Sequence, residues 1–282
     1  MKVRCQIIAT LLAGALFAAP LSATDGAAYL APRGPGGKPD LNGTWQAWNR
    51  ANDDLEHHAA KAAMAFREGP AGPVPAKEVV ALGAIGAVPA GMGVVVGGEI
   101  PYQPAARKKK AYNQKHWLSL DPEIKCYQPG IPRATYMPYP FQILHNEDAL
   151  FFAYEYAGAV RNIHLTDPGP APIDSWMGQS VGRWDGDTLI IETTGQNDQA
   201  WLDRAGNFHS EALRVIERFT PTSSHTMSYE ALLEDQKIFT QPWTIRMTLY
   251  RLVGDDARLQ QFNCVEFVEE LMYGHLRKKP LD

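Results

Sequence analysis

The segment NDQAWLDRAGNFHSE, from Asn197 to Glu211, gathers side chains that could do chemistry. It holds three carboxylates, one histidine, one arginine, two asparagines and one tryptophan within fifteen residues. A histidine exchanges protons near neutral pH, and a neighbouring carboxylate raises its pKa and fixes its tautomer. The composition of the segment is therefore typical of a site for proton transfer.

The residues that follow this segment indicate which way its side chains point. Alternate residues share one face of a β-strand. One face of the predicted strand carries His209, Glu211, Leu213, Val215, Glu217 and Phe219. Because Leu213, Val215 and Phe219 make this the more buried face, we expect His209 and Glu211 to point inward at the rim of a hollow β body. We predict His209 as the catalytic acid or base, oriented by Glu211 or Asp203.

Other residues are candidates for contact with a substrate. Asn197 and Asp198 belong to the same segment, and Trp201 is an aromatic side chain among polar neighbours. Tyr154 and Arg161 lie on predicted strands. Aromatic walls with a few polar groups at the mouth are the usual composition of a small-molecule site.

A charge inside a barrel is normally paired. The sequence therefore also allows an inward ion pair between Arg161 and Glu192.

Three alternatives to catalysis by His209 stay open. Asp198 and Asp203 could cap turns while His209 and Glu211 only hold the loop. His209 and Glu211 could instead bind a metal ion from one strand face, although no third ligand is marked by spacing. The same cavity could also belong to a non-catalytic carrier of a hydrophobic ligand.

The N-terminus predicts export. Lys2 and Arg4 precede an apolar run from 7 to 19, and Leu21-Ser22-Ala23 is a plausible cleavage site. This arrangement is typical of a signal peptide, and the run is shorter than the roughly 20 residues that span a bilayer. We expect residues 1–23 to be removed, 24–40 to form a flexible lead-in, and the mature protein to be periplasmic or secreted without a membrane span.

The overall charge argues against nucleic acid as a partner. Cleavage after Ala23 removes two basic residues and no acidic one, so the formal charge moves from −4 to −6. A mildly acidic protein lacks the basic surface that binds phosphate backbones. No dinucleotide or P-loop motif is present, so we expect no organic cofactor. The oligomeric state stays open.

Two cysteines remain after cleavage, Cys126 and Cys264. They are far apart in sequence and form no CxxC motif, so in an oxidising compartment they predict one structural disulfide. We expect it to join a last strand over 259–267 to the middle of the chain.

The region 141–282 predicts antiparallel β-structure. Short alternating segments follow one another at regular spacing, and Asp185-Gly186 separates two of them as a hairpin turn would. In the segment 243–250, Trp243 and Ile245 alternate with Thr244 and Arg246, which indicates one buried face. Closing the strands into a barrel would remove exposed edges. We therefore predict a lipocalin-like antiparallel barrel or a sandwich.

The region 41–140 predicts an irregular wrap within the same single β-rich domain, 41–282. The segment 41–48 is typical of a first strand, 53–66 has helix-forming composition, and 107–120 predicts another short helix. The segment 68–104 carries little charge and is rich in Gly, Pro, Ala and Val, which suggests an extended layer or a lid.

Several motifs resemble a family of exported bacterial proteins. The resemblance rests on PDLNGTW, GGEIPYQP, GRWDGDTLIIET and WLDRAGNFHSEALRVIERF, and it covers most of the mature chain. It implies one exported unit and implies no substrate. The GTW of the first segment is also similar to the Gly-x-Trp of lipocalins, in agreement with a barrel.

Together these features predict an exported enzyme that binds a small apolar or aromatic molecule in a β-barrel. Acid–base chemistry such as elimination, isomerisation, hydration or hydrolysis would fit the candidate residues.

Overall fold

The computed structural model describes residues 29–60, 66–70, 72–75 and 88–264. Nine strands close into one barrel in the order β1-β11-β10-β9-β8-β7-β6-β5-β4. Their bounds are β1 (Gly43–Ala47), β4 (Phe141–His145), β5 (Leu150–Tyr154), β6 (Val160–His164), β7 (Gln179–Asp185), β8 (Thr188–Thr194), β9 (Arg214–Pro221), β10 (Thr226–Glu234) and β11 (Trp243–Arg251). The predicted barrel is therefore confirmed, and residues 41–48 supply its first strand.

One pairing departs from the antiparallel prediction. Strands β6 and β7 are parallel and pair only at Ile163–Ser180 and His164–Val181. A parallel pair needs a longer connection than a hairpin. The segment 165–178 supplies that connection, which the sequence pattern did not reveal as a crossover.

The barrel interior follows the predicted alternation. Residues Met227, Tyr229, Ala231 and Leu233 of β10 are fully buried, and the intervening positions are more exposed. Strand β11 buries Trp243 and its alternate neighbours in the same way. Burial of these aromatic and aliphatic side chains is the main source of stability for such a body.

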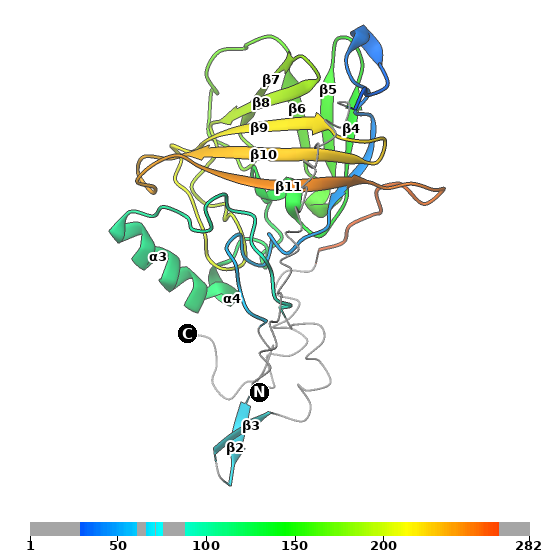
Figure 1. Ribbon diagram of the computed structural model, residues 1–282. Coiled ribbons are helices and arrows are strands. Elements are labelled where there is room, and N and C mark those ends of the chain that lie inside the picture. The colour runs from blue at the N-terminus through cyan, green and yellow to red at the C-terminus, as the bar shows by residue number, and fades with distance from the viewer. Residues whose placement is uncertain (1–28, 61–65, 71, 76–87, 265–282) are drawn as a thin grey trace, which may run out of the picture.

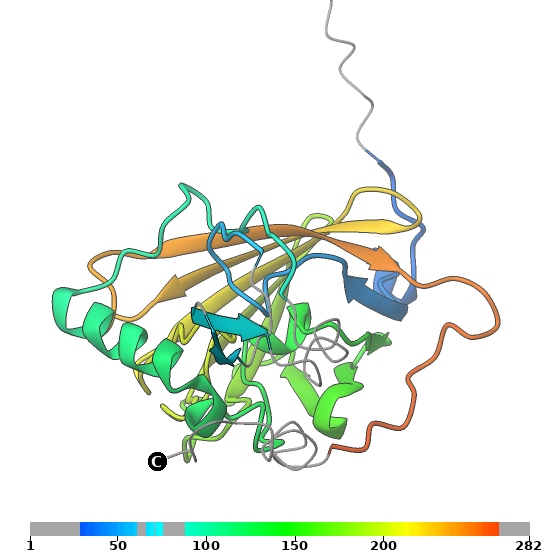
Figure 2. The same ribbon diagram turned by 90° about the horizontal axis from the view of Figure 1, so that it is seen from below.

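Figure 1 shows the barrel above and the irregular segments with α3 (Pro104–Lys115) and α4 (Trp117–Leu120) below it. The view from below in Figure 2 shows α3 along one flank of the molecule. These two helices confirm the one predicted over 107–120. The short helix α5 (Arg133–Tyr136) is buried and contacts β1.

The other elements are short. They are the 3-10 turns η1 (Pro35–Gly37) and η2 (Tyr156–Gly158) and the two-stranded sheet β2 (Phe66–Gly69) and β3 (Gly72–Pro75).

Two predicted elements are wrong. No helix forms over 53–60, and Phe66 begins β2 instead of ending a helix. The backbone N–H of Leu55 donates to Asp203, so tertiary contacts override the helix-forming composition. The predicted strand over 259–267 is also absent from its described part, 259–264. The predicted signal peptide lies outside the described residues.

Candidate functional site

The segment that contains the predicted site is held together by Asp203. Its Oδ1 accepts hydrogen bonds from the backbone N–H groups of Ala205 at 2.9 Å and Asn207 at 3.2 Å. Its Oδ2 accepts from the N–H of Leu55 at 2.8 Å and from Nδ2 of Asn207 at 2.6 Å. The prediction that Asp203 orients His209 is therefore not supported, because both of its oxygens are engaged in fixing the loop.

Asp203 should make stability depend on pH. Burial, together with the charge of Asp54, raises the pKa of Asp203 to about 7. The unfolded chain releases this proton near pH ~3.9, so between these values the folded state binds more protons than the unfolded state. The stability contributed by this group is full below pH ~4 and is lost as the pH rises through 7.

The Asp203→Asn variant checks this expectation. It should lower the free energy of unfolding by about 1–3 kcal/mol, because the amide nitrogen of asparagine cannot accept a hydrogen bond, whereas both oxygens of a carboxyl group can. The loss, measured by urea unfolding, should be greater at pH 5 than at pH 8. An equal loss at both values would show that Asp203 does not titrate in this range.

His209 and Glu211 do not share a face. His209 is buried, and its Nδ1 donates to the backbone oxygen of Ser210 at 2.9 Å. Glu211 lies at the surface and forms an ion pair with Lys237. The expected inward orientation of both residues is wrong, because β9 begins at Arg214 and a turn at 211–212 reverses the alternation.

This arrangement removes the predicted catalytic pair. Burial lowers the pKa of His209, so its imidazole is neutral at neutral pH. No carboxylate of the described residues forms a hydrogen bond with its ring. The metal alternative needs His209 and Glu211 on one strand face, which they do not share. The described residues also contain no group of three or more His, Cys, Asp or Glu side chains that could hold a metal ion.

The predicted contact residues divide between two places. Asp198 and Trp201 line one hollow outside the barrel, while the Oδ1 of Asn197 accepts a turn hydrogen bond from the N–H of Gln199. Tyr154 and Arg161 instead lie together inside the barrel, where both side chains are buried.

Arg161 is bound to a network of polar side chains. Its Nε donates to Oγ of Ser180 at 2.7 Å, its Nη2 donates to Oγ1 of Thr193 at 2.6 Å, and the same nitrogen forms an ion pair with Glu217. The prediction that Glu192 pairs with Arg161 is wrong. Strand β8 turns Thr193 inward and Glu192 outward, where Glu192 binds Arg214.

Glu217 completes this network from β9. Its Oε1 accepts from the hydroxyl of Tyr229 at 2.8 Å and from that of Thr135, on α5, at 3.5 Å. We call Tyr154, Arg161, Ser180, Thr193, Glu217 and Tyr229 the Arg161 cluster. The sequence contained a signal for Glu217, since a carboxylate between Val215 and Phe219 interrupts an apolar strand face.

Two donors of the Arg161 cluster, Nη1 of Arg161 and the hydroxyl of Tyr154, are buried and form no hydrogen bond of ordinary geometry with a described residue. The two side chains nevertheless interact with each other, and the side chain of Tyr154 also interacts with that of Thr135. Burial raises the pKa of Tyr154, with an opposing effect from the nearby charge of Arg161, so the hydroxyl keeps its proton. A buried donor left fully unpaired costs about 1–3 kcal/mol, so an acceptor that gave both groups a well-aligned hydrogen bond would be favoured.

A hollow of about 270 Å³ borders two residues of the cluster, Arg161 and Ser180. It lies where β6 and β7 diverge, and its lining includes Arg161 and Ser180 as well as His164 at the end of β6. Val160 and Asn162, which face outward from β6, also line this hollow, so it lies on the outer side of the barrel wall beside the buried residues Arg161 and Ser180.

A second buried charge network lies below the barrel. Arg133 donates to Asp121 at 3.1 Å and to Glu123 at 2.6 Å, and Arg204 binds Glu123 through two nitrogens at 2.8 and 2.7 Å. Although burial opposes ionisation, Arg133 and Arg204 lower the pKa of Glu123 to about 2. Every charge here faces an opposite charge, and the arrangement is typical of a structural network.

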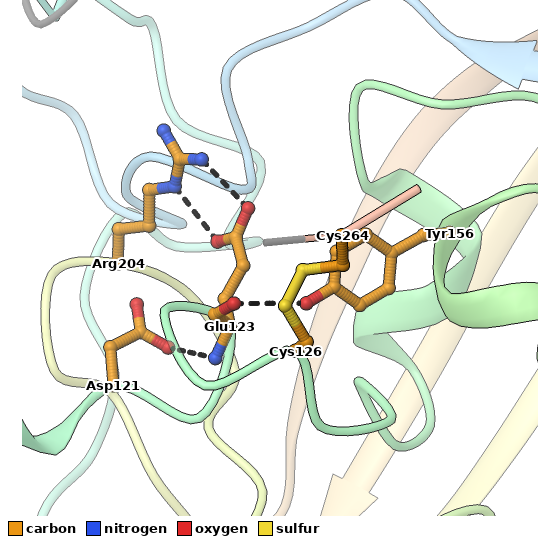
Figure 3. The surroundings of a disulfide bond; sticks show 6 residues. All are labelled: Asp121, Glu123, Cys126, Tyr156, Arg204 and Cys264. Atoms are coloured by element: carbon orange, nitrogen blue, oxygen red, sulfur yellow. Dashed lines mark hydrogen bonds and ion pairs between the residues drawn. A yellow bond between two sulfur atoms is a disulfide. The ribbon is translucent and has the colours of Figure 1, made fainter. Parts of the chain in front are cut away.

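The predicted disulfide between Cys126 and Cys264 is confirmed beside this network (Figure 3). Figure 3 also shows the hydroxyl of Tyr156 donating to the backbone oxygen of Glu123. The disulfide therefore ties the segment after β11 to the same loop that carries Glu123.

Comparison with known proteins adds no relative: no family model, curated protein or solved structure matches the chain. Among the helices of the described residues, none has the length and apolar character needed to cross a membrane.

Proposed function

We propose that the protein is an enzyme that binds a small molecule through a carbonyl oxygen at the Arg161 cluster. The observation that carries this proposal is the pair of buried donors, Nη1 of Arg161 and the hydroxyl of Tyr154, neither of which forms a hydrogen bond of ordinary geometry with a described residue. Two donors at one oxygen form the kind of site that stabilises a developing negative charge.

The charge of the cluster favours a neutral ligand. Glu217 already neutralises Arg161, so a bound anion would be an additional buried charge without a partner. A neutral carbonyl group accepts both hydrogen bonds without that cost. The surrounding side chains are aromatic; Phe152 is fully buried, and the guanidinium lies 5.7 Å from the centre of its ring. The ligand class is therefore a small aromatic or apolar ketone or aldehyde.

The reaction that fits this arrangement is proton abstraction from the carbon next to the carbonyl. Glu217 would accept the proton and become neutral, while the substrate oxygen becomes an enolate paired with Arg161. The total charge of the cluster stays the same during this step, so little of the usual penalty for creating a buried charge arises. Isomerisation and elimination both begin with this step.

Binding of acetophenone labelled with ¹³C at the carbonyl tests the first part of the proposal. Infrared spectroscopy should show the carbonyl band of the bound ketone at lower frequency than in water, because two donors polarise it. The Tyr154→Phe variant should reduce this shift and weaken binding by about fivefold, the loss of one hydrogen bond of about 1 kcal/mol.

Tyr250→Phe is the matched control, since Tyr250 lies at the barrel surface and is 43% exposed. It should leave the band and the affinity unchanged. An unaltered carbonyl band in the Tyr154→Phe protein would exclude Tyr154 as a donor to the ligand.

A further inference from the structure

A separate hollow of about 240 Å³ lies outside the barrel and is walled by aromatic rings. Tyr127, Trp176 and Trp201 come from three different segments of the chain. The rings of Tyr127 and Trp176 lie with centroids 5.0 Å apart, and Trp201 is 7% exposed. We call this hollow the aromatic pocket; it does not depend on the function proposed for the Arg161 cluster.

Three polar side chains at the aromatic pocket are free to bind a ligand. Lys125, Asp198 and Gln199 line it, and their side chains form no hydrogen bond or ion pair with any other described residue. They combine a cationic donor, an anionic acceptor and an amide that does both. Free polar groups next to aromatic walls are the arrangement expected of a specific ligand site.

The walls of the pocket are held in place before any ligand binds. Trp201 pairs with Phe208 in a β-bridge, and the loop between them is fixed by Asp203. Tyr127 follows Cys126, which is joined to Cys264. A rigid site loses less conformational entropy on binding.

The charges at the pocket select the ligand class. Lys125 and Asp198 have opposite signs, so neither a cation nor an anion is favoured by the net charge. A sugar ring is neutral, its C–H face packs on aromatic rings, and its hydroxyls both donate and accept hydrogen bonds. We propose that the aromatic pocket binds one neutral pyranose ring of a carbohydrate.

Saturation-transfer NMR with the methyl glycosides of glucose, galactose and mannose tests this proposal on the full mature chain. We expect saturable binding of at least one glycoside with a Kd near ~1 mM, which corresponds to about −4 kcal/mol. Trp176→Ala should weaken binding at least ~10-fold through loss of one stacking wall.

The Asp198→Asn variant should weaken binding about fivefold, because a neutral acceptor replaces a charged one. Trp48→Ala serves as the matched control, since Trp48 is 74% exposed and does not line the pocket. It should bind the glycoside as the unaltered protein does.

Three outcomes would overturn the proposal. One is the absence of saturable binding of all three glycosides up to about 50 mM, well above the expected Kd. Another is tighter binding of tetramethylammonium than of any glycoside, which would make the pocket a cation site. The third is equal binding by Trp176→Ala and the unaltered protein, which would place any bound glycoside outside the pocket.

Discussion

Replacing Arg161 by methionine should lower the free energy of unfolding by about 3–5 kcal/mol. The substitution leaves Glu217 fully buried with no cation beside it, and it removes the hydrogen bonds from Nε and Nη2 to Ser180 and Thr193. Chemical denaturation monitored by tryptophan fluorescence measures the loss. An exposed pair of the same residue types, Arg246 and Glu230, supplies the control. Arg246→Met should cost less than about 1 kcal/mol.

A double variant separates the ion pair from simple packing. Glu217→Gln removes the uncompensated charge, so in the Arg161→Met background it should restore part of the lost stability. We expect a coupling energy between the two positions of about 2–3 kcal/mol. Additive effects of the two substitutions would mean that the ion pair between Arg161 and Glu217 contributes no coupling energy to stability.

Removing the disulfide should have an effect of similar size. The bond between Cys126 and Cys264 spans 138 residues, and closing a loop of that length restricts the unfolded chain by about 4–5 kcal/mol. The Cys126→Ser/Cys264→Ser double variant should therefore unfold at a much lower denaturant concentration.

A reducing agent provides the control for this prediction. It should bring the unaltered protein to the stability of the double variant and leave the variant itself unchanged. A difference below about 1 kcal/mol would show that the unfolded chain gains little freedom when the bond is absent.

The barrel could be predicted from the sequence because its signals are local. Alternation in β10 and β11 and the turn after Asp185 are readable within ten residues, and each element agrees with its neighbours. The parallel pairing of β6 and β7 could not be predicted in this way. It depends on the path of the 165–178 connection, which has no periodicity.

The predicted catalytic pair failed at a strand boundary. Leu213, Val215 and Phe219 are buried as expected, but the alternation of buried and exposed residues does not extend back to Glu211. Strand ends are the least predictable part of a pattern, since one turn reverses every side chain that precedes it. The loop around Asp203 is nevertheless well ordered by hydrogen bonds, which explains its unusual density of polar residues.

The Arg161 cluster inside the barrel could be predicted only in part from the sequence. Arg161 and Tyr154 were predicted as contact residues, and Glu217 stood out on an apolar face, but their convergence depends on strands that are distant in sequence. Networks such as Arg133 with Glu123 had no signal at all, because they form between loops without periodic spacing.

Proton exchange next to the carbonyl tests the central claim most directly. In D₂O, the protein should accelerate replacement of the methyl protons of acetophenone by deuterium, followed by NMR. Glu217→Gln should lower this rate by at least ~100-fold, the range for loss of a general base, while circular dichroism confirms that the variant is folded. Exchange at the same rate in the folded Glu217→Gln protein would contradict the assignment of Glu217 as the base and the proposed chemistry with it.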